Sequence, residues 1–246
     1  MQARRPRYFK LNCMLSVRPD DPWVKSRLDI AVGRFHFQPM KSLIPLVAGI
    51  LFAGTALLAA PVSLFDGKSF AGWDGDTTNT FSIRDGMIVG GALTRLQPRN
   101  EFLATTRSYT NFVLRLKFKL TGTEGFVNSG VQFRSQRVPH DSEMSGYQAD
   151  LGEGWYGALY DESRRNKLMA KADEAAVQKA VKKGDWNNYE LRCEGRHIVL
   201  RINGETTVDY TEADEKIPQT GRFGLQVHGG GKTEVFFKDI EIEELK

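Results

Sequence analysis

Apolar and polar residues alternate along most of the chain after residue 60. The clearest run is 112–120, in which Phe and Leu occupy the even positions and Val, Arg and Lys the odd ones. A period of two indicates β-strands that bury one face. Comparable runs occur at 81–89, 130–136, 146–151, 188–193, 197–202, 222–228 and 234–243. With so many short strands and glycine-rich turns between them, the sequence predicts an all-β sandwich.

One segment departs from this alternation. Residues 173–183, "DEAAVQKAVKK", consist largely of helix-forming residues, with Asp173 in a capping position and Gly184 directly after the end. Its basic C-terminal turn suits the helix dipole. We therefore expect one short helix, inserted between strands and covering an edge of the sandwich.

The first 60 residues have a different character. Residues 43–60 are mostly apolar, follow Lys41 and end in two alanines, which predicts a signal peptide at 40–60 that is cleaved to leave a mature domain at 61–246. A retained membrane anchor is the alternative, because about 20 apolar residues can span a bilayer. Residues 1–39 form a basic leader or a mis-assigned start, and we expect them to be disordered.

Removal of that leader reverses the net charge. The chain has 34 Lys/Arg and 30 Asp/Glu, of which nine and three lie in residues 1–60, so 25 and 27 remain and the net charge is −2. Nucleic-acid binding requires a basic face on the folded domain, so we expect no such partner. The mature protein is expected to be periplasmic or secreted, without stable membrane insertion. Cys193 is the single cysteine of 61–246, so no internal disulfide is expected there.

Three predicted strands combine an amide with an ionisable side chain on the face opposite the core. Such faces are usually just solvated, because antiparallel sheets commonly turn one polar face to water. Gln, Arg, Asp and His are, however, directional groups that suit the recognition of sugar hydroxyls. If the strands are neighbours, they form a polar groove. The pairs are Gln132 and Arg134, Gln148 and Asp150, and Gln226 and His228, while Asn128 belongs either to a turn or to the groove.

The segment 152–165 combines aromatic rings with charges. Trp155 and Tyr160 are suited to stacking on a pyranose ring, and the acids and arginines around them to hydrogen bonding. The equally weighted alternative is a hydrophobic plug whose charges pair with one another. Glycoside cleavage commonly requires two carboxyl groups. The eligible acids are Asp150, Asp161 and Glu162, and the arginine proposed to bind substrate is Arg164.

Other chemistry has little support in the sequence. His140 and His228 have no second His or Cys at metal-ligand spacing, so we expect no metal site and no cofactor. An Asp-rich calcium loop is also missing from the sequence, which argues against a calcium-dependent adhesion domain.

The order of several segments resembles that of the 3-keto-disaccharide hydrolase family, over essentially all of 61–246. The segments are "SLFDGKSFAGW" at 63–73, "NSGVQFRSQ" at 128–136, "GALYDESRRNK" at 157–167, "GDWNNYELRCEGRHIVLRINGETTVDY" at 184–210 and "GRFGLQVHGGGKTEVFFKDIEIEEL" at 221–245. The resemblance implies a concanavalin-like jelly-roll β-sandwich with one short inserted helix. It also implies an exported glycoside hydrolase that cleaves 3-keto-disaccharides or 3-keto-glycosides.

In that chemistry the C3 ketone acidifies the C2 proton, the C1 leaving group departs by elimination, and water adds back. A separate sugar 3-dehydrogenase must first form the ketone. The resemblance implies Asp150 or Glu162 as base or acid, with Arg134 and His228 near the carbonyl oxygen. Many members have a Glu-x-Gln pair where this chain has Gln148-Ala149-Asp150. The alternative function is a non-catalytic carbohydrate-binding jelly-roll module, because this fold serves both roles.

Overall fold

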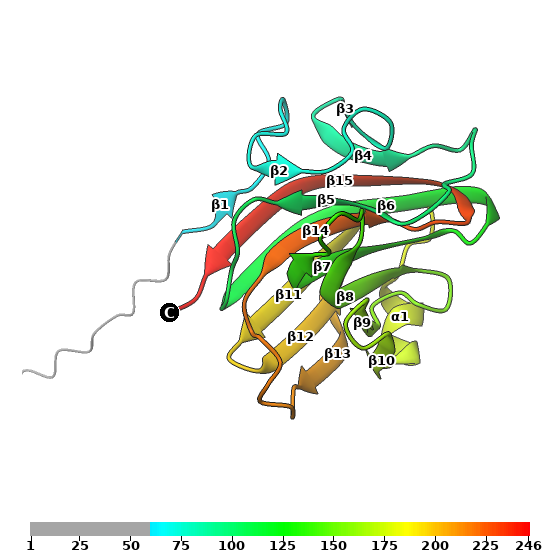
Figure 1. Ribbon diagram of the computed structural model, residues 1–246. Coiled ribbons are helices and arrows are strands. Elements are labelled where there is room, and N and C mark those ends of the chain that lie inside the picture. The colour runs from blue at the N-terminus through cyan, green and yellow to red at the C-terminus, as the bar shows by residue number, and fades with distance from the viewer. Residues whose placement is uncertain (1–59) are drawn as a thin grey trace, which may run out of the picture. The chain divides into compact units, whose positions relative to one another are not determined.

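The computed structural model describes residues 60–246, which form fifteen strands and one helix (Figure 1). The expected leader at 1–39 and nearly all of the expected signal peptide at 40–60 lie outside the described residues. Within 60–246, no helix has the length and apolar character needed to cross a membrane.

An eight-stranded antiparallel sheet forms one layer of the fold. Seven strands follow one another across it, and β1 pairs with β15 beside them. The strands in spatial order are β13 (Glu205–Thr211), β12 (His197–Ile202), β11 (Asn187–Glu194), β6 (Phe112–Gly125), β15 (Gly231–Glu244), β4 (Met87–Gly91) and β3 (Phe81–Arg84), and β1 is Val62–Ser63.

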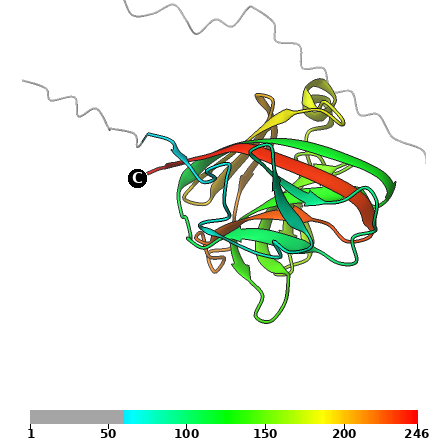
Figure 2. The same cartoon turned by 90° about the horizontal axis from the view of Figure 1, so that it is seen from above.

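A seven-stranded antiparallel sheet forms the other layer. Figure 2 shows this arrangement from above, with β15 in one layer and β14 in the other. The strands in spatial order are β10 (Lys167–Ala170), β9 (Leu159–Glu162), β8 (Met144–Gly152), β7 (Asn128–Arg137), β14 (Arg222–Val227), β5 (Glu101–Thr105) and β2 (Trp73–Asp74). The all-β sandwich predicted from the alternating pattern is therefore confirmed.

The hydrophobic core lies between the two sheets and draws on both. Phe112, Leu114, Leu116 and Phe118 of β6 are buried there, as the period of two requires. They pack with the inward-facing apolar residues of β7, β8 and β14. Because both inner faces serve this core, an open polar site is expected on the outer faces or in the loops.

The inserted helix α1 (Glu174–Ala180) is shorter than the segment 173–183 in which a helix was expected. The Asp173 side chain caps its N-terminus by accepting a hydrogen bond from the Ala176 amide at 2.8 Å. The helix contacts β13, the edge strand of the eight-stranded sheet. Its expected position over a sheet edge is therefore confirmed.

The three strands expected to form a groove are neighbours, in the order β8, β7, β14. Arg134 does not share their outer face, contrary to the expectation. The strand register shifts around it and its φ is +49°, so the alternation of side chains breaks at this residue. Its guanidinium instead donates to the Thr110 carbonyl at 2.6 Å and lies 5.9 Å from the centre of the Phe112 ring.

A buried ion-pair cluster holds the turn between β9 and β10. Asp161 is fully buried and accepts hydrogen bonds from Arg164 and Arg165, which follow it in the turn. Arg165 also donates to Glu212 at 2.8 Å, and the Tyr147 hydroxyl donates to the same carboxylate at 2.6 Å. Asp161 and Arg164, expected to bind substrate, are therefore engaged with other protein groups.

This cluster sets the direction of the neighbouring side chains of β9. Because successive side chains of a strand point to opposite faces, burial of Asp161 turns Tyr160 and Glu162 to the outer face. The Ser163 hydroxyl also donates to Glu143 at 3.2 Å, which ties the turn to the end of the β7–β8 connection.

We predict that Glu212→Gln lowers the free energy of unfolding by about 3 kcal/mol at pH 7, because it removes one partner of a buried ion pair. Burial opposes ionisation of Glu212, but hydrogen bonds from Arg165 and Tyr147 outweigh it and lower its pKa to about 2. The stabilisation is therefore present above about pH 4, where the unfolded chain ionises, and is lost as the pH falls through 2. Urea unfolding at several pH values measures it.

The matched control is Glu190→Gln. Glu190 also contacts two arginines, Arg115 and Arg201, but on an exposed face. Its loss is expected to cost less than about 1 kcal/mol. Equal costs for the two variants would contradict the assigned role of the cluster.

Candidate functional site

A pocket of about 210 Å³ opens on the outer face of the seven-stranded sheet. Strands β7, β8 and β9 contribute the acids, the amides and one tyrosine, and the loops next to β7, β8 and β14 contribute Phe126, Trp155 and His228. The residues that line it are Phe126, Asn128, Gln148, Asp150, Trp155, Tyr160, Glu162 and His228. Seven of the twelve residues expected at the site therefore meet in one place.

Aromatic rings stand on two sides of this pocket. Trp155 and Tyr160 pack edge to face with their ring centres 6.1 Å apart. Phe126 packs in the same manner on His228, at 4.7 Å. Phe126 is 43% exposed, so much of its ring remains available for contact with a ligand. Apolar ring faces of this kind, combined with polar groups, suit a sugar ring.

Asp150 is the most buried acid of the pocket, with 3% of its surface exposed. Its Oδ1 accepts a hydrogen bond from Gln148 Nε2 at 2.7 Å. Burial raises the pKa of Asp150 to about 8, because removal from water disfavours the charged form; the Gln148 hydrogen bond opposes this rise only in part. Asp150 is therefore a neutral acid at neutral pH.

Glu162 is the second acid and is half-buried. Burial, followed by the charges of Glu143 and Asp161, raises the pKa of Glu162 to about 7. A substantial fraction of this carboxyl group is therefore ionised at neutral pH, when Asp150 is protonated. Two acids in one pocket with different charge states can act as base and acid.

The ring of His228 is held in one tautomer. Its Nδ1 lies 2.6 Å from the Gly229 carbonyl oxygen, which can only accept a hydrogen bond. The Nδ1 atom therefore carries the hydrogen, and in the neutral ring Nε2 keeps a free lone pair. A neutral His228 thus presents an acceptor, for example to a sugar hydroxyl, rather than the donor expected near a carbonyl oxygen.

The remaining expected residues do not line the pocket. Gln132 and Gln226 lie on the correct face but are fully buried, while Arg134, Asp161 and Arg164 are bonded elsewhere as described above. Sequence reasoning missed Phe126. A phenylalanine between Gly125 and a strand would ordinarily be assigned to the core, and only its 43% exposure shows otherwise. The one sequence feature that could have indicated Phe126 is its position two residues before Asn128, which was itself expected at the groove.

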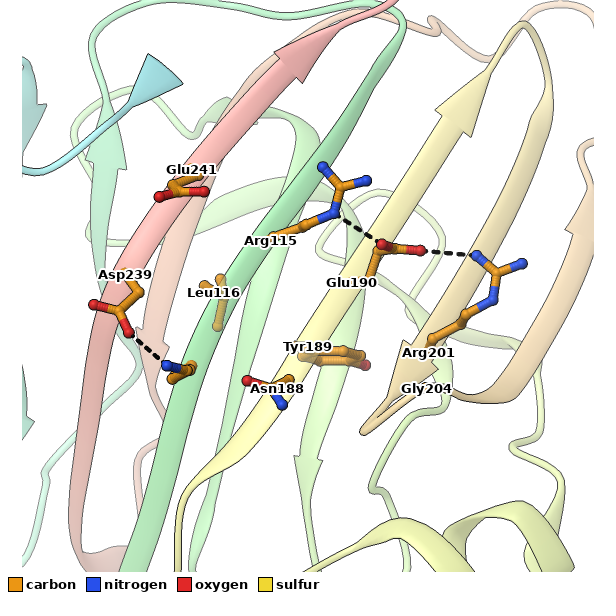
Figure 3. A pocket seen from close by; sticks show the side chains of 10 residues that line it. Arg115, Leu116, Asn188, Tyr189, Glu190, Arg201, Gly204, Asp239 and Glu241 are labelled. Atoms are coloured by element: carbon orange, nitrogen blue, oxygen red, sulfur yellow. Dashed lines mark hydrogen bonds and ion pairs between the residues drawn. The ribbon is translucent and has the colours of Figure 1, made fainter. Parts of the chain in front are cut away.

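A larger pocket of about 420 Å³ lies on the outer face of the eight-stranded sheet. Figure 3 shows Arg115, Glu190 and Arg201 in a row across β6, β11 and β12, each bonded to the next. Lys117 and Asp239 form a further ion pair beside them, at 2.8 Å. Most charges of this surface pair with one another, and Glu241 beside them has no ion-pair partner among the described residues, as is ordinary for a solvated face. Within residues 60–246, no group of three or more His, Cys, Asp or Glu side chains is placed to hold a metal ion.

Comparison with known proteins places this site in context. A family model described as the 3-keto-alpha-glucoside-1,2-lyase-like domain matches residues 60–243. Among curated protein sequences, none matches the chain.

Solved structures with a similar fold include proteins connected with carbohydrates. A candidate glycosyl hydrolase from Parabacteroides distasonis has 23% identity and a TM-score of 0.57, with 76% of this chain and 94% of that chain covered. The carbohydrate-binding module CBM66 from Bacillus subtilis has 15% identity and a TM-score of 0.55, with coverages of 70% and 96%. At these identities the likeness establishes the fold alone. The family match supports a carbohydrate-active role.

We predict that Asp150→Asn stabilises the protein at alkaline pH. The native carboxyl is neutral when folded up to about pH 8, whereas the unfolded chain ionises near pH 4, so the native protein loses up to ~1.4 kcal/mol of stability per pH unit in that interval. Asparagine keeps the acceptor for Gln148 and does not titrate. The melting temperature of the variant should exceed that of the native protein by more at pH 9 than at pH 5. A difference independent of pH would contradict the assigned neutral state.

Proposed function

Because the chain belongs to the 3-keto-alpha-glucoside-1,2-lyase-like family, we propose that it cleaves 3-keto-disaccharides or 3-keto-glycosides at the C1–oxygen bond. One observation carries the proposal: Asp150 and Glu162 share a pocket in which burial keeps one acid neutral and leaves the other partly ionised. The aromatic rings of the pocket supply the surface on which the sugar packs.

The ketone determines the chemistry. A carbonyl at C3 stabilises negative charge at C2, so the C2 proton is far more acidic than in an ordinary sugar. We assign Glu162 as the base that takes this proton, because the base must be ionised and Glu162 has the lower pKa. The electrons of the C2–H bond form a C1=C2 double bond as the C1–O bond breaks.

Asp150 then completes the elimination as the acid. It transfers its proton to the departing oxygen, and its raised pKa means that this proton is present at neutral pH. Water next adds across the double bond, with its hydroxyl on C1 and its remaining proton on Asp150, while Glu162 returns a proton to C2. Both acids regain their starting states, and one water is consumed.

The substrate must come from another reaction. Formation of a ketone at C3 is an oxidation, a different class of reaction from the proposed elimination, so the proposal includes a separate sugar 3-dehydrogenase. We further propose that cleavage takes place outside the cytoplasm, as the apolar segment at 43–60 suggests.

We predict a bell-shaped pH dependence for kcat/KM on a 3-keto-disaccharide, with a maximum between about pH 7 and 8. Activity should rise as Glu162 ionises near pH 7 and fall as Asp150 loses its proton near pH 8. Release of 3-ketoglucose is the readout.

Glu162→Gln and Asp150→Asn should each lower kcat by about 10² to 10⁴-fold. Asp209→Asn, which changes an exposed acid of β13, is the control and should leave the profile unchanged.

Elimination also predicts an isotope effect. A substrate deuterated at C2 should be cleaved more slowly than the unlabelled one, because this mechanism breaks the C2–H bond. Deuterium at C5 should have no such effect and serves as the matched control. Equal rates with and without deuterium at C2 would instead indicate displacement at C1 by the carboxyl pair, as in ordinary glycosidases.

A non-catalytic module would give a different set of results. Glycan binding would then persist in Asp150→Asn and Glu162→Gln, without release of 3-ketoglucose by the folded native protein across several linkages. That combination would replace the proposed enzyme with a carbohydrate-binding function.

A further inference from the structure

A row of buried polar side chains crosses the seven-stranded sheet and ends at Asp150. The Ser135 hydroxyl donates to Gln132 Oε1, and Gln132 Nε2 donates to Gln148 Oε1 at 3.2 Å. Gln148 Nε2 then donates to Asp150 Oδ1 at 2.7 Å. Gln132 and Ser135 are fully buried, and Gln148 is 2% exposed. Only Gln148 and Asp150 reach the pocket itself.

Each amide in this row sets the orientation of the next. With Gln148 nitrogen directed at Asp150, its oxygen is directed at Gln132, which must therefore present its own nitrogen. The Gln132 oxygen is left to accept from the Ser135 hydroxyl. An amide flipped alone would place two oxygens or two NH₂ groups against each other, at the cost of a buried hydrogen bond.

We propose that Gln132 and Gln148 are positioning residues that determine which oxygen of Asp150 carries the acidic proton. Because Oδ1 already accepts from Gln148, the neutral carboxyl holds its proton on Oδ2 and donates from that atom. The proposal rests on the catalytic role given to Asp150 in the proposed function. We call the hydrogen-bonded row of Ser135, Gln132 and Gln148 the relay. It acts on the reaction through Asp150, and Gln132 itself does not contact the substrate.

Gly130 makes this arrangement possible. It lies between Asp150 on β8 and Gln226 on β14 in the strand register. A Cβ atom at position 130 would lie 2.6 Å from Gln148 Cδ and 2.9 Å from its Nε2. Only glycine therefore allows Gln148 to lie across β7 and reach both of its partners.

Gln226 offers a matched control for the relay. It is a fully buried glutamine on the same outer face, directly opposite Gly130, yet neither its amide nitrogen nor its amide oxygen has a hydrogen-bond partner among the described residues. Its replacement by methionine removes a buried amide of the same size without breaking the relay.

The test measures the protonation of Asp150 directly, by carbon-13 NMR titration of protein labelled at aspartate carboxyl groups, with Asp150→Asn used to assign the signal. Gln148→Met should raise the pKa of Asp150 by about one unit, because a hydrogen bond to the carboxylate is lost. Gln132→Met should raise it by less, and Gln226→Met should leave it unchanged. Gly130→Ala, which displaces Gln148, should act in the same direction as Gln148→Met.

These variants leave the titratable groups around Asp150 in place. Glu162 and Tyr160 of β9, His228 after β14, and Tyr189 of β11 on the opposite sheet are retained in each of them. A pKa change can therefore be attributed to the hydrogen-bond chain. With a 3-keto-disaccharide, Gln132→Met should lower kcat at least about tenfold, the cost of 1.4 kcal/mol in the transition state, with little change in KM.

The outcomes separate this proposal from the proposed function. An unchanged pKa and kcat in Gln132→Met would overturn the positioning role, as would equal pKa changes in Gln132→Met and Gln226→Met. If the pKa moves as expected while the native protein releases no 3-ketoglucose, the relay stands and the proposed function fails.

Discussion

Desolvation of a carboxyl group without a counter-ion is the constraint on which the site depends. Asp150 lies on a sheet face where its hydrogen-bond donor is an amide and the charge that acts on it is that of another acid, Glu162. Such a group stays neutral in the folded state and becomes a proton donor at neutral pH. The surrounding structure serves to keep water away from it and to keep cations out of reach.

The arginines of the molecule illustrate that second requirement. Arg134 is withdrawn from the outer face by a break in the strand alternation, and Arg164 and Arg165 are engaged by Asp161 and Glu212 on the other side of β9. A guanidinium free to approach Asp150 would stabilise its ionised form and lower its pKa. The same ion pairs that hold the turn after β9 thereby help to keep the pKa of Asp150 high.

The site also lowers the stability of the folded state. Two acids with raised pKa values destabilise the native state as the pH rises toward them, whereas Glu212, with its lowered pKa, stabilises the native state over the same range. Stability and activity therefore draw on different carboxyl groups: Asp150 and Glu162 lie on the outer face of β8 and β9, whereas Glu212 directly follows β13 of the other sheet. A buried amide relay adds further polar groups to the sheet, which is tolerated because each of its links is hydrogen-bonded.

The alternating pattern of the sequence by itself determined the all-β class and the outward direction of Gln148 and Asp150, because side-chain direction in a regular strand depends only on position. The helix-forming residues of 173–183, which interrupt that pattern, determined the inserted helix. It failed at Arg134, where a local break in that regularity leaves no mark in the residue pattern. It also could not decide between sugar binding and internal pairing for the acids and arginines after Trp155. Only the tertiary structure separated Glu162 from Asp161 and brought Phe126 to the pocket, because burial and pairing depend on strands that are distant in the sequence.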